Sequence, residues 1–446
     1  MSELSSSKPI MESEISTSSS DMNVSVPQID ESSMEFNRAN IDSLSKFIRL
    51  VDTDTSTGLD LYCYIQCEPH DSEIRKQCRG VVFNKDKLIM KGFPYTMEYT
   101  QNENLPDIND NITNSFDKCS FYDSYEGSLI RMFYFKDKWY LSTNRKLDAF
   151  RSKWASKESF GSFFKKALEY EFENNERLKS NVDFTPGKDD AIERFQSVLD
   201  TNKQYMFLLL NNNENRIVCS APDKPAIFHV GTFVNFDLKM DEDVYISYPK
   251  KHDFSNIDEL FDYVNNIDYK YLQGVIAFTP GNYQYKIFNQ EYHDLYNARG
   301  NEPSIKFRYL QVRMNKKYND ILHYLYPEYK NSFADYENYI YDIARDITKS
   351  YVERFIKKNY VTVPVEEFQV IRECHTWHLL DRLENKININ KVIDILNTQP
   401  PTNINRMIRK RIMEKNNTKD GTSEPIKLKT REHISLLRNK SFTVEK

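Results

Sequence analysis

Short β-rich runs alternate with polar turns from residue 40 to residue 305, and no other feature constrains the fold of this chain as strongly. Runs of this kind joined by short polar turns are typical of antiparallel hairpins. We expect four such hairpins, which pair residues 80–83 with 87–90, 129–135 with 139–142, 205–210 with 216–219, and 274–278 with 283–288. Helical spacing interrupts them at residues 146–174, 189–200 and 256–265. The pattern predicts an α+β fold built on antiparallel sheets.

Apolar residues recur at a spacing of three and four from about residue 307, which predicts a helical region. The expected helices cover residues 309–326, 332–359, 365–383 and 387–396, and prolines separate them. The segment after them, residues 403–446, has 12 Lys or Arg against five Asp or Glu, a local net charge of +7. Its densest basic cluster is Arg406, Arg409, Lys410 and Arg411. We therefore predict a β-rich domain at 37–306, an all-helical domain at 307–402 and a basic C-terminal tail at 403–446.

The first 36 residues differ in composition from the rest of the chain. They contain 12 Ser and seven acidic residues against one Lys, with few large apolar side chains. Such a segment buries too little surface to offset its ordering entropy, so we predict a disordered tail at residues 1–36. The whole chain has a formal net charge of −5, which excludes a basic nucleic-acid coat. Any contact with phosphates must therefore come from local patches.

Cysteine usage and hydropathy bear on the compartment. The six cysteines show no paired framework, which favours reduced thiols in a cytosol-like compartment. Cys63 and Cys67 lack the second pair that a zinc site needs, so packing is the favoured interpretation. No apolar run approaches the roughly 18 residues of a membrane span. Richness in Asn, Ile, Lys and Tyr with only 11 Gly is typical of an AT-rich genome, such as that of a large DNA virus. We expect a cytoplasmic protein, in the host cytoplasm or a virus factory if it is viral.

Five segments of the β-rich region contain the residues that point to chemistry. In chain order they are residues 78–83 with 91–94, 124–130 with 141–146, 205–209 with 214–218, 273–276, and 285–287. Together they resemble the phage-type ATP-dependent RNA ligase family, within the superfamily of DNA ligases, RNA ligases and mRNA capping enzymes. The resemblance covers roughly residues 70–310. It implies a nucleotidyltransferase domain of the ATP-grasp-like ligase kind.

The nucleophile position of that family holds Ser124 in this chain. The family motif is Lys-x-Asp/Glu-Gly, whose lysine attacks the α-phosphate of ATP and forms a lysyl-AMP phosphoramidate. Nitrogen can be protonated as it leaves, so the adenylate passes readily to a 5′-phosphate on RNA. A serine hydroxyl is barely ionised at neutral pH, and its AMP product would be a phosphodiester that is hard to resolve. The resemblance offers Lys286 as a displaced substitute, because lysines of the fifth motif contact the α-phosphate.

Three further positions depart from the family pattern. The run Phe207-Leu208-Leu209-Leu210 has no counterpart of the carboxylate of the third motif. The fourth motif, normally Glu-Gly-Val, reads Gln273-Gly274-Val275, and this degenerate position should bind Mg²⁺ poorly. In the fifth motif, the second lysine position is Gln284. Metal-assisted phosphoryl transfer relies on such charges for positioning and electrostatic stabilisation.

The motif residues that remain are Arg79, Glu126, Gly127, Arg216 and Lys286. The resemblance implies that they can still cradle a nucleotide. Alternatively, Glu126 and Gly127 are a hairpin remnant and Arg216 is a surface ion-pair partner. We favour an RNA-ligase-like protein, deficient in adenylation, that binds RNA ends or a nucleotide, with ATP and Mg²⁺ bound weakly or not at all. The rivals are an active ATP-dependent RNA ligase that uses Lys286, and an interaction protein that retains only the fold.

The C-terminal region extends this hypothesis by analogy only. Phage-type ligases use a helical domain to grip RNA, but no residues can be matched there. The +7 segment suits phosphate contacts, and its lack of interleaved aromatic residues argues against base stacking. Cys374, His375 and His378 lie on one expected helix, where packing is favoured over metal binding. Trp139 and Trp154 are expected to fill the core.

Overall fold

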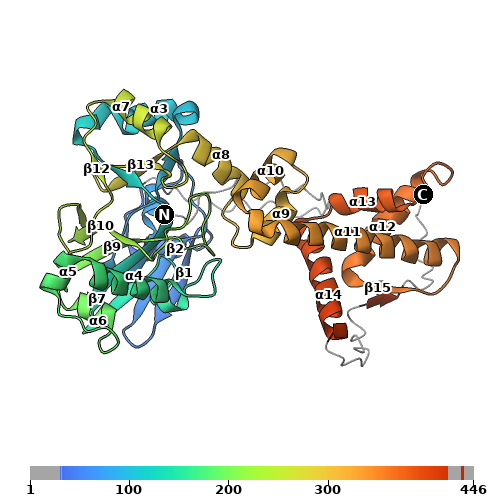
Figure 1. Cartoon of the computed structure of the whole chain (residues 1–446), viewed down its shortest axis with the longest axis horizontal. Helices are drawn as coiled ribbons and strands as arrows, with labels where there is room; N and C mark the ends of the chain where they lie inside the picture. Colours follow the sequence, from blue (N-terminus) through green and yellow to red (C-terminus); the bar gives the residue numbers. More distant parts are fainter. Residues whose placement is uncertain (1–30, 32, 420–432, 436–446) are drawn as a thin grey trace. The chain divides into compact units, whose positions relative to one another are not determined.

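The computed structural model describes residues 31, 33–419 and 433–435, and they form two compact units. The first unit ends at Pro303 and the second begins at Ser304, close to the predicted boundary between residues 306 and 307. Figure 1 shows strands concentrated in the first unit and helices in the second. The antiparallel sheets and the helical C-terminal region confirm the predicted α+β class.

The first sheet of unit 1 is a four-stranded antiparallel meander. Its order is β1-β2-β3-β4, with bounds β1 Ile48–Asp54, β2 Leu59–Tyr64, β3 Arg79–Asn84 and β4 Lys87–Met90. Two short helices, α1 (Arg38–Ser43) and α2 (Glu73–Gln77), precede and interrupt the meander. Ile41 of α1 and Ile74 of α2 pack with Phe83 in one apolar cluster.

A second, five-stranded sheet has the order β11-β10-β9-β7-β8. Its strands are β7 Gly127–Phe135, β8 Lys138–Ser142, β9 Lys203–Leu210, β10 Ile227–Val234 and β11 Asp237–Lys239. One face packs against α4 (Phe160–Asn174), α5 (Glu176–Asn181) and α6 (Ala191–Gln196). The cluster is rich in aromatic residues: Phe164 of α4 and Phe195 of α6 both meet the ring of Phe207 edge-on.

The third sheet has the order β12-β6-β13-β14-β5. Its strands are β5 Met97–Tyr99, β6 Ser120–Ser124, β12 Lys251–His252, β13 Gly274–Thr279 and β14 Tyr283–Phe288. Helices α3 (Gln101–Asn111) and α7 (Ile257–Asn266) pack on one face of it (Figure 1). A central cluster takes Val82, Met206 and Ile276 from the three sheets, so the sheets share one core. The chain passes from the third sheet to the second between β6 and β7, at residues 124–127.

Three of the four predicted hairpins are confirmed, and the pairing of residues 205–210 with 216–219 is wrong. Strand β9 pairs with β10 instead. The backbone amides of Ile217 and Val218 donate to the Glu126 carboxylate, so this segment meets its hydrogen-bonding needs without a ladder. The predicted helix over 146–174 begins only at Phe160, where the Ser159 hydroxyl accepts from the amide of Ser162.

The second unit contains six α-helices in the described residues. They are α9 Ile305–Val312, α10 Lys316–Leu325, α11 Lys330–Tyr351, α12 Val365–Leu380, α13 Ile389–Asn397 and α14 Pro401–Lys419. The prediction of an all-helical domain is wrong in one detail, because β15 (Thr362–Pro364) pairs with β16 (His433–Ser435). His375 stacks on Phe355 with ring centroids 4.0 Å apart, so it takes part in packing, as expected.

The predicted basic tail is also corrected, because residues 403–419 belong to α14. Pro401 is the first residue of this helix, where a missing N–H costs nothing. Arg411 bridges α14 to two neighbouring helices through Asp346, at 3.0 Å, and Glu367, at 2.5 Å. Lys410 lies 3.9 Å from Glu366. Two of the four residues of the predicted basic cluster, Lys410 and Arg411, therefore form ion pairs within the second unit.

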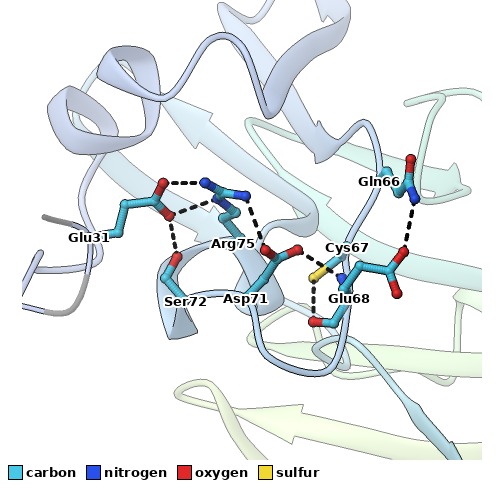
Figure 2. Close-up of polar contacts among 7 residues, drawn as sticks. All are labelled: Glu31, Gln66, Cys67, Glu68, Asp71, Ser72 and Arg75. Atoms are coloured by element: carbon cyan, nitrogen blue, oxygen red, sulfur yellow. Dashed lines mark hydrogen bonds and ion pairs between the residues drawn. The ribbon is translucent and has the colours of Figure 1, made fainter. Parts of the chain in front are cut away.

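The described end of the predicted disordered tail is packed against the first unit, which corrects that prediction for residues 31 and 33–36. Figure 2 shows the Glu31 carboxylate bound by both the Arg75 guanidinium and the Ser72 hydroxyl. Phe36 stacks on Phe83 with ring centroids 6.4 Å apart. The guanidinium of Arg75 lies 3.4 Å from the centroid of the Phe47 ring. The remaining residues of the predicted tail lie outside the described part of the chain.

We expect Glu31→Gln to lower the free energy of unfolding by about 1–2 kcal/mol at neutral pH, because a bidentate, charge-assisted hydrogen bond is lost. Burial acts to raise the pKa of the Glu31 carboxyl, but the bonds from Arg75 and Ser72 outweigh it and lower the pKa below 4.5. The contribution is therefore full above pH 4.5 and is lost as the pH falls through the lower folded value. Urea unfolding at neutral pH and at a pH well below 4.5 measures this contribution. The exposed Glu35→Gln is the control, and equal stabilities of the two variants would contradict the prediction.

Candidate functional site

Ser124 and Gln273, the two positions that replace the family's nucleophile and metal carboxylate, are in direct contact. Ser124 ends β6, and the antiparallel register places it opposite Gly274 at the start of β13. The Ser124 hydroxyl donates to the side-chain oxygen of Gln273 at 3.1 Å, and the backbone amide of Gln273 donates to the backbone carbonyl of Ser124 at 2.8 Å. Both side chains are buried, at 4% and 1% exposure. They form a neutral, internally satisfied pair.

This pair continues into a chain of buried hydrogen bonds. The side-chain amide of Gln273 donates to the Tyr292 hydroxyl at 2.8 Å, on helix α8 (Gln290–Arg299). The Tyr292 hydroxyl donates to the Glu126 carboxylate at 3.0 Å. The other donors to this carboxylate are the amides of Ile217, at 3.1 Å, and Val218, at 2.7 Å. Burial, followed by the nearby charge of Glu126, raises the pKa of Tyr292, so its hydroxyl stays a neutral donor.

Glu126 and Gly127 have clear structural roles. Both oxygens of the Glu126 carboxylate accept bonds from within unit 1, so the residue holds the loop after β9 against α8. At Gly127, a Cβ atom would lie 2.6 Å from the carbonyl oxygen of Leu209 on the neighbouring strand. Only glycine therefore allows β7 and β9 to approach this closely. Arg216 lies half-buried, directly before the two amides that bind Glu126.

Lys286 lines the same narrow pocket as Ser124. It lies on β14 at 2% exposure, and its ammonium group is 3.2 Å from the Glu98 carboxylate on β5. The rest of the pocket wall is largely apolar and includes Leu208, Ile276 and Phe278. The interior volume is about 20 Å³, which corresponds to about one water molecule. This space does not fit an adenosine as the side chains stand.

Arg79 and Gln284 converge on one hydroxyl. The Arg79 guanidinium donates to the Thr96 hydroxyl at 2.7 Å and to the Pro94 carbonyl at 3.1 Å. The Gln284 amide donates to the same hydroxyl at 2.5 Å. Arg79 is 4% exposed, and no carboxylate lies within ion-pair distance of it in the part of the chain that the structure describes. Arg79 is thus a buried cation held by neutral oxygens.

Asp123, His252 and Tyr263 lie next to Ser124 and are not among the residues predicted for the site. The Asp123 carboxylate accepts from the Tyr263 hydroxyl at 2.7 Å and bonds to Nε2 of His252 at 2.8 Å. Asp123 lines the same pocket as Ser124. No sequence signal links these residues, because His252 and Tyr263 come from β12 and α7, more than a hundred residues downstream.

The fit to a metal-bound nucleotide is poor. Gln273 is neutral, and among the described residues no three His, Cys, Asp or Glu side chains are grouped as metal ligands. The residues present thus do not fit Mg²⁺-ATP in this arrangement.

Two further findings bear on the whole chain. The six cysteines are all free thiols. No described helix has the length and apolarity to span a bilayer.

No protein-family model matches the chain. Among solved structures, it is similar to a putative ATP-dependent DNA ligase from Aquifex aeolicus, with a TM-score of 0.37 and 12% identity, over 76% of this chain and 88% of that one. It is also similar to an archaeal ATP-dependent RNA ligase, with a TM-score of 0.36 and 11% identity, over 77% and 86%. Because both TM-scores are below 0.5, we draw no functional conclusion from them.

The relatives by sequence are viral proteins, in agreement with the expectation from composition. The immediate-early protein ICP-46 homolog of Invertebrate iridescent virus 6 is 26% identical over 88% of this chain and 90% of that protein. The ICP-46 protein of Frog virus 3 is 27% identical over 58% and 64%. The ICP-46 homolog of Invertebrate iridescent virus 3 is 30% identical over 77% of this chain and 74% of that protein. The chain therefore belongs to the family of the viral immediate-early protein ICP-46 and its homologs.

Proposed function

We propose that this protein is a ligase-like nucleotidyltransferase relative that binds RNA ends or a nucleotide and has lost adenylation. The observation that supports the proposal most is the hydrogen bond between Ser124 and Gln273. The resemblance places a nucleophilic lysine and a metal-binding glutamate at these two positions. A hydroxyl that donates to an amide has no general base to activate it. A neutral amide also supplies no charge for a divalent cation.

Retained cations support binding. The resemblance assigns Arg79 and Lys286 to nucleotide contact, and both cations are buried in unit 1. In the second unit, Arg406 and Arg409 are exposed on α14, whereas Arg411 is ion-paired internally. Exposed cations at this spacing lie on one helix face, where they suit contacts to RNA phosphates. The proposed place of action is the host cytoplasm or a virus factory.

An active ATP-dependent RNA ligase is the second candidate, because Lys286 shares a pocket with Ser124. The ion pair with Glu98 counts against it, since an ammonium group must lose its proton before it can attack phosphorus. The third candidate is an interaction protein that keeps only the fold. The closed network around Glu126 suits that role, because the network is satisfied without a ligand.

Adenylation separates these candidates. We expect no covalent AMP after incubation of the wild-type protein with ATP and Mg²⁺ or Mn²⁺, as measured by intact mass and by radiolabel transfer. Ser124→Lys alone should also remain unlabelled, because Gln273 and the Leu208–Leu209 strand still lack the metal carboxylates. An AMP adduct on the wild type that Lys286→Ala abolishes and that Lys239→Ala, a change of an exposed lysine outside the motif segments, preserves would establish the active-ligase candidate instead.

RNA binding by the helical unit is tested separately. We expect Arg406→Ala/Arg409→Ala to weaken binding of a single-stranded RNA and to reduce the slope of log K against log salt by about 1.4, for two lost phosphate contacts. Fluorescence anisotropy at several salt concentrations gives both quantities. The control is Arg345→Ala, because Arg345 is an exposed arginine of the same unit already paired with Asp342 at 2.9 Å. A double variant with wild-type affinity and slope would exclude these residues from the RNA contact.

A further inference from the structure

A second pocket of unit 1 shares no residue with the Ser124 network. It lies between the β1–β2 turn, strand β8, the loop that follows β8, and helix α6. Its interior volume is about 440 Å³, within the range of roughly 300–1,000 Å³ for small-molecule sites. The pocket beside Ser124, at about 20 Å³, is far smaller. Of these two pockets, the larger one has the volume of a small-molecule binding site.

One wall of this pocket is an exposed aromatic ring in a fixed position. Phe150 is 44% exposed, which is unusual for a phenylalanine beside a cavity. Behind it, Gly161 of α4 has no side chain, and a Cβ atom there would lie 2.6 Å from Cγ of Phe150. The ring therefore rests directly against the helix backbone. Trp139 and Ile192 add apolar surface next to it. A supported ring with one open face suits the stacking of a flat ligand.

Several polar groups of the pocket keep hydrogen-bonding capacity for a ligand. The Arg151 guanidinium is 61% exposed, and the structure gives it one long ion pair, 3.7 Å from the Asp52 carboxylate. One oxygen of Asp148 accepts from the Phe150 amide at 2.8 Å, while the other has no such bond. The side-chain amide of Gln196 is likewise without a bond in this part of the chain. A cation, an acceptor and an amide thus border one aromatic wall.

The remaining charges of the pocket neutralise each other. Asp54 lies 3.2 Å from the Lys138 ammonium group and accepts from the Tyr140 hydroxyl at 2.8 Å. Burial acts to raise the pKa of Asp54, but hydrogen bonds from Ser56, Tyr140 and Lys138 lower it strongly, so the carboxylate stays ionised. Asp54 and Lys138 are thus a matched pair. Arg151, held only by its long ion pair with Asp52, is the cation that a ligand can contact, and Asp148 is the anion.

The ligand that matches these groups has a flat ring, an edge with hydrogen-bond donors, and a negative charge. A nucleotide has all three, and single-stranded RNA is recognised by base stacking on aromatic side chains together with contacts to cations. We propose that this pocket binds one nucleotide of a single-stranded RNA, with the base on Phe150 and the phosphate at Arg151. Asp148 and Gln196 then face the base edge, where a carboxylate accepts from an exocyclic amine such as that of cytosine. The assignment rests on the proposed RNA binding.

Anisotropy titrations of the full chain with labelled oligocytidine and oligouridine test this proposal. We expect Phe150→Ala and Arg151→Ala each to weaken oligocytidine binding about tenfold. Arg177→Ala is the matched control, because Arg177 is an arginine of the same unit whose side chain is 66% exposed, and it should bind as the wild type does. Phe150→Trp should keep the affinity, which separates lost stacking from lost folding. Asp148→Asn should reduce the preference for cytidine over uridine.

The outcomes separate this site from the broader proposal. Ultraviolet crosslinking of bound oligocytidine to the peptide that contains Phe150 and Arg151 would support the pocket directly. If the wild type binds RNA and the Phe150 and Arg151 variants bind it equally well, the pocket assignment is overturned and RNA binding stands. If the wild type binds neither oligonucleotide, both the pocket assignment and the proposed RNA binding are overturned.

Discussion

The Glu126 carboxylate is the interaction on which the first unit most depends. It lies where the chain leaves the third sheet for the second, and it binds the loop after β9 and the hydroxyl of Tyr292 on α8. A buried carboxylate is tolerated only when its oxygens are satisfied, and here three donors satisfy them. The same bonds fix the positions of Gln273 and, through it, Ser124. The geometry of the candidate site is therefore a consequence of this one buried charge.

Two pockets of the first unit each have part of the properties of a binding site. The pocket beside Ser124 is lined by Ser124 and Lys286, two of the positions that the family resemblance singles out, but its walls are largely apolar and its space is small. The larger pocket has an open aromatic ring and polar groups available to a ligand, yet none of the motif residues. The proposed loss of adenylation at one pocket and the proposed binding at the other are compatible, because the two sets of residues do not overlap. The proposed function thus requires no reaction at the place where the ligand binds.

Much of the fold could be predicted from local patterns, and the failures have physical causes. Hairpins with short turns were recognised because both strands lie within one window of sequence. The pairing of β9 with β10 was missed because the segment between them binds Glu126, a contact that no periodicity reveals. The helical spacing of residues 146–174 predicts one continuous helix, whereas Phe150 and Arg151 lie in a separate 3-10 turn, Ala149–Arg151, before α4 begins at Phe160. Their place beside a pocket follows from this break, which the spacing does not reveal. Tyr292 and His252 reach the site from distant strands and helices, without any local signal.

The hydrogen bond between Ser124 and Gln273 also bears on how such a protein can change. Replacing Ser124 alone by lysine would bury an ammonium group against a neutral amide, and replacing Gln273 alone by glutamate would bury an extra carboxylate. Either step places an uncompensated charge in a closed site, which costs several kcal/mol by order of magnitude. A change from the neutral pair to a charged pair needs both substitutions, and either one alone produces such a state. The neutral pair is therefore favoured over either single substitution that would bring back one charged group.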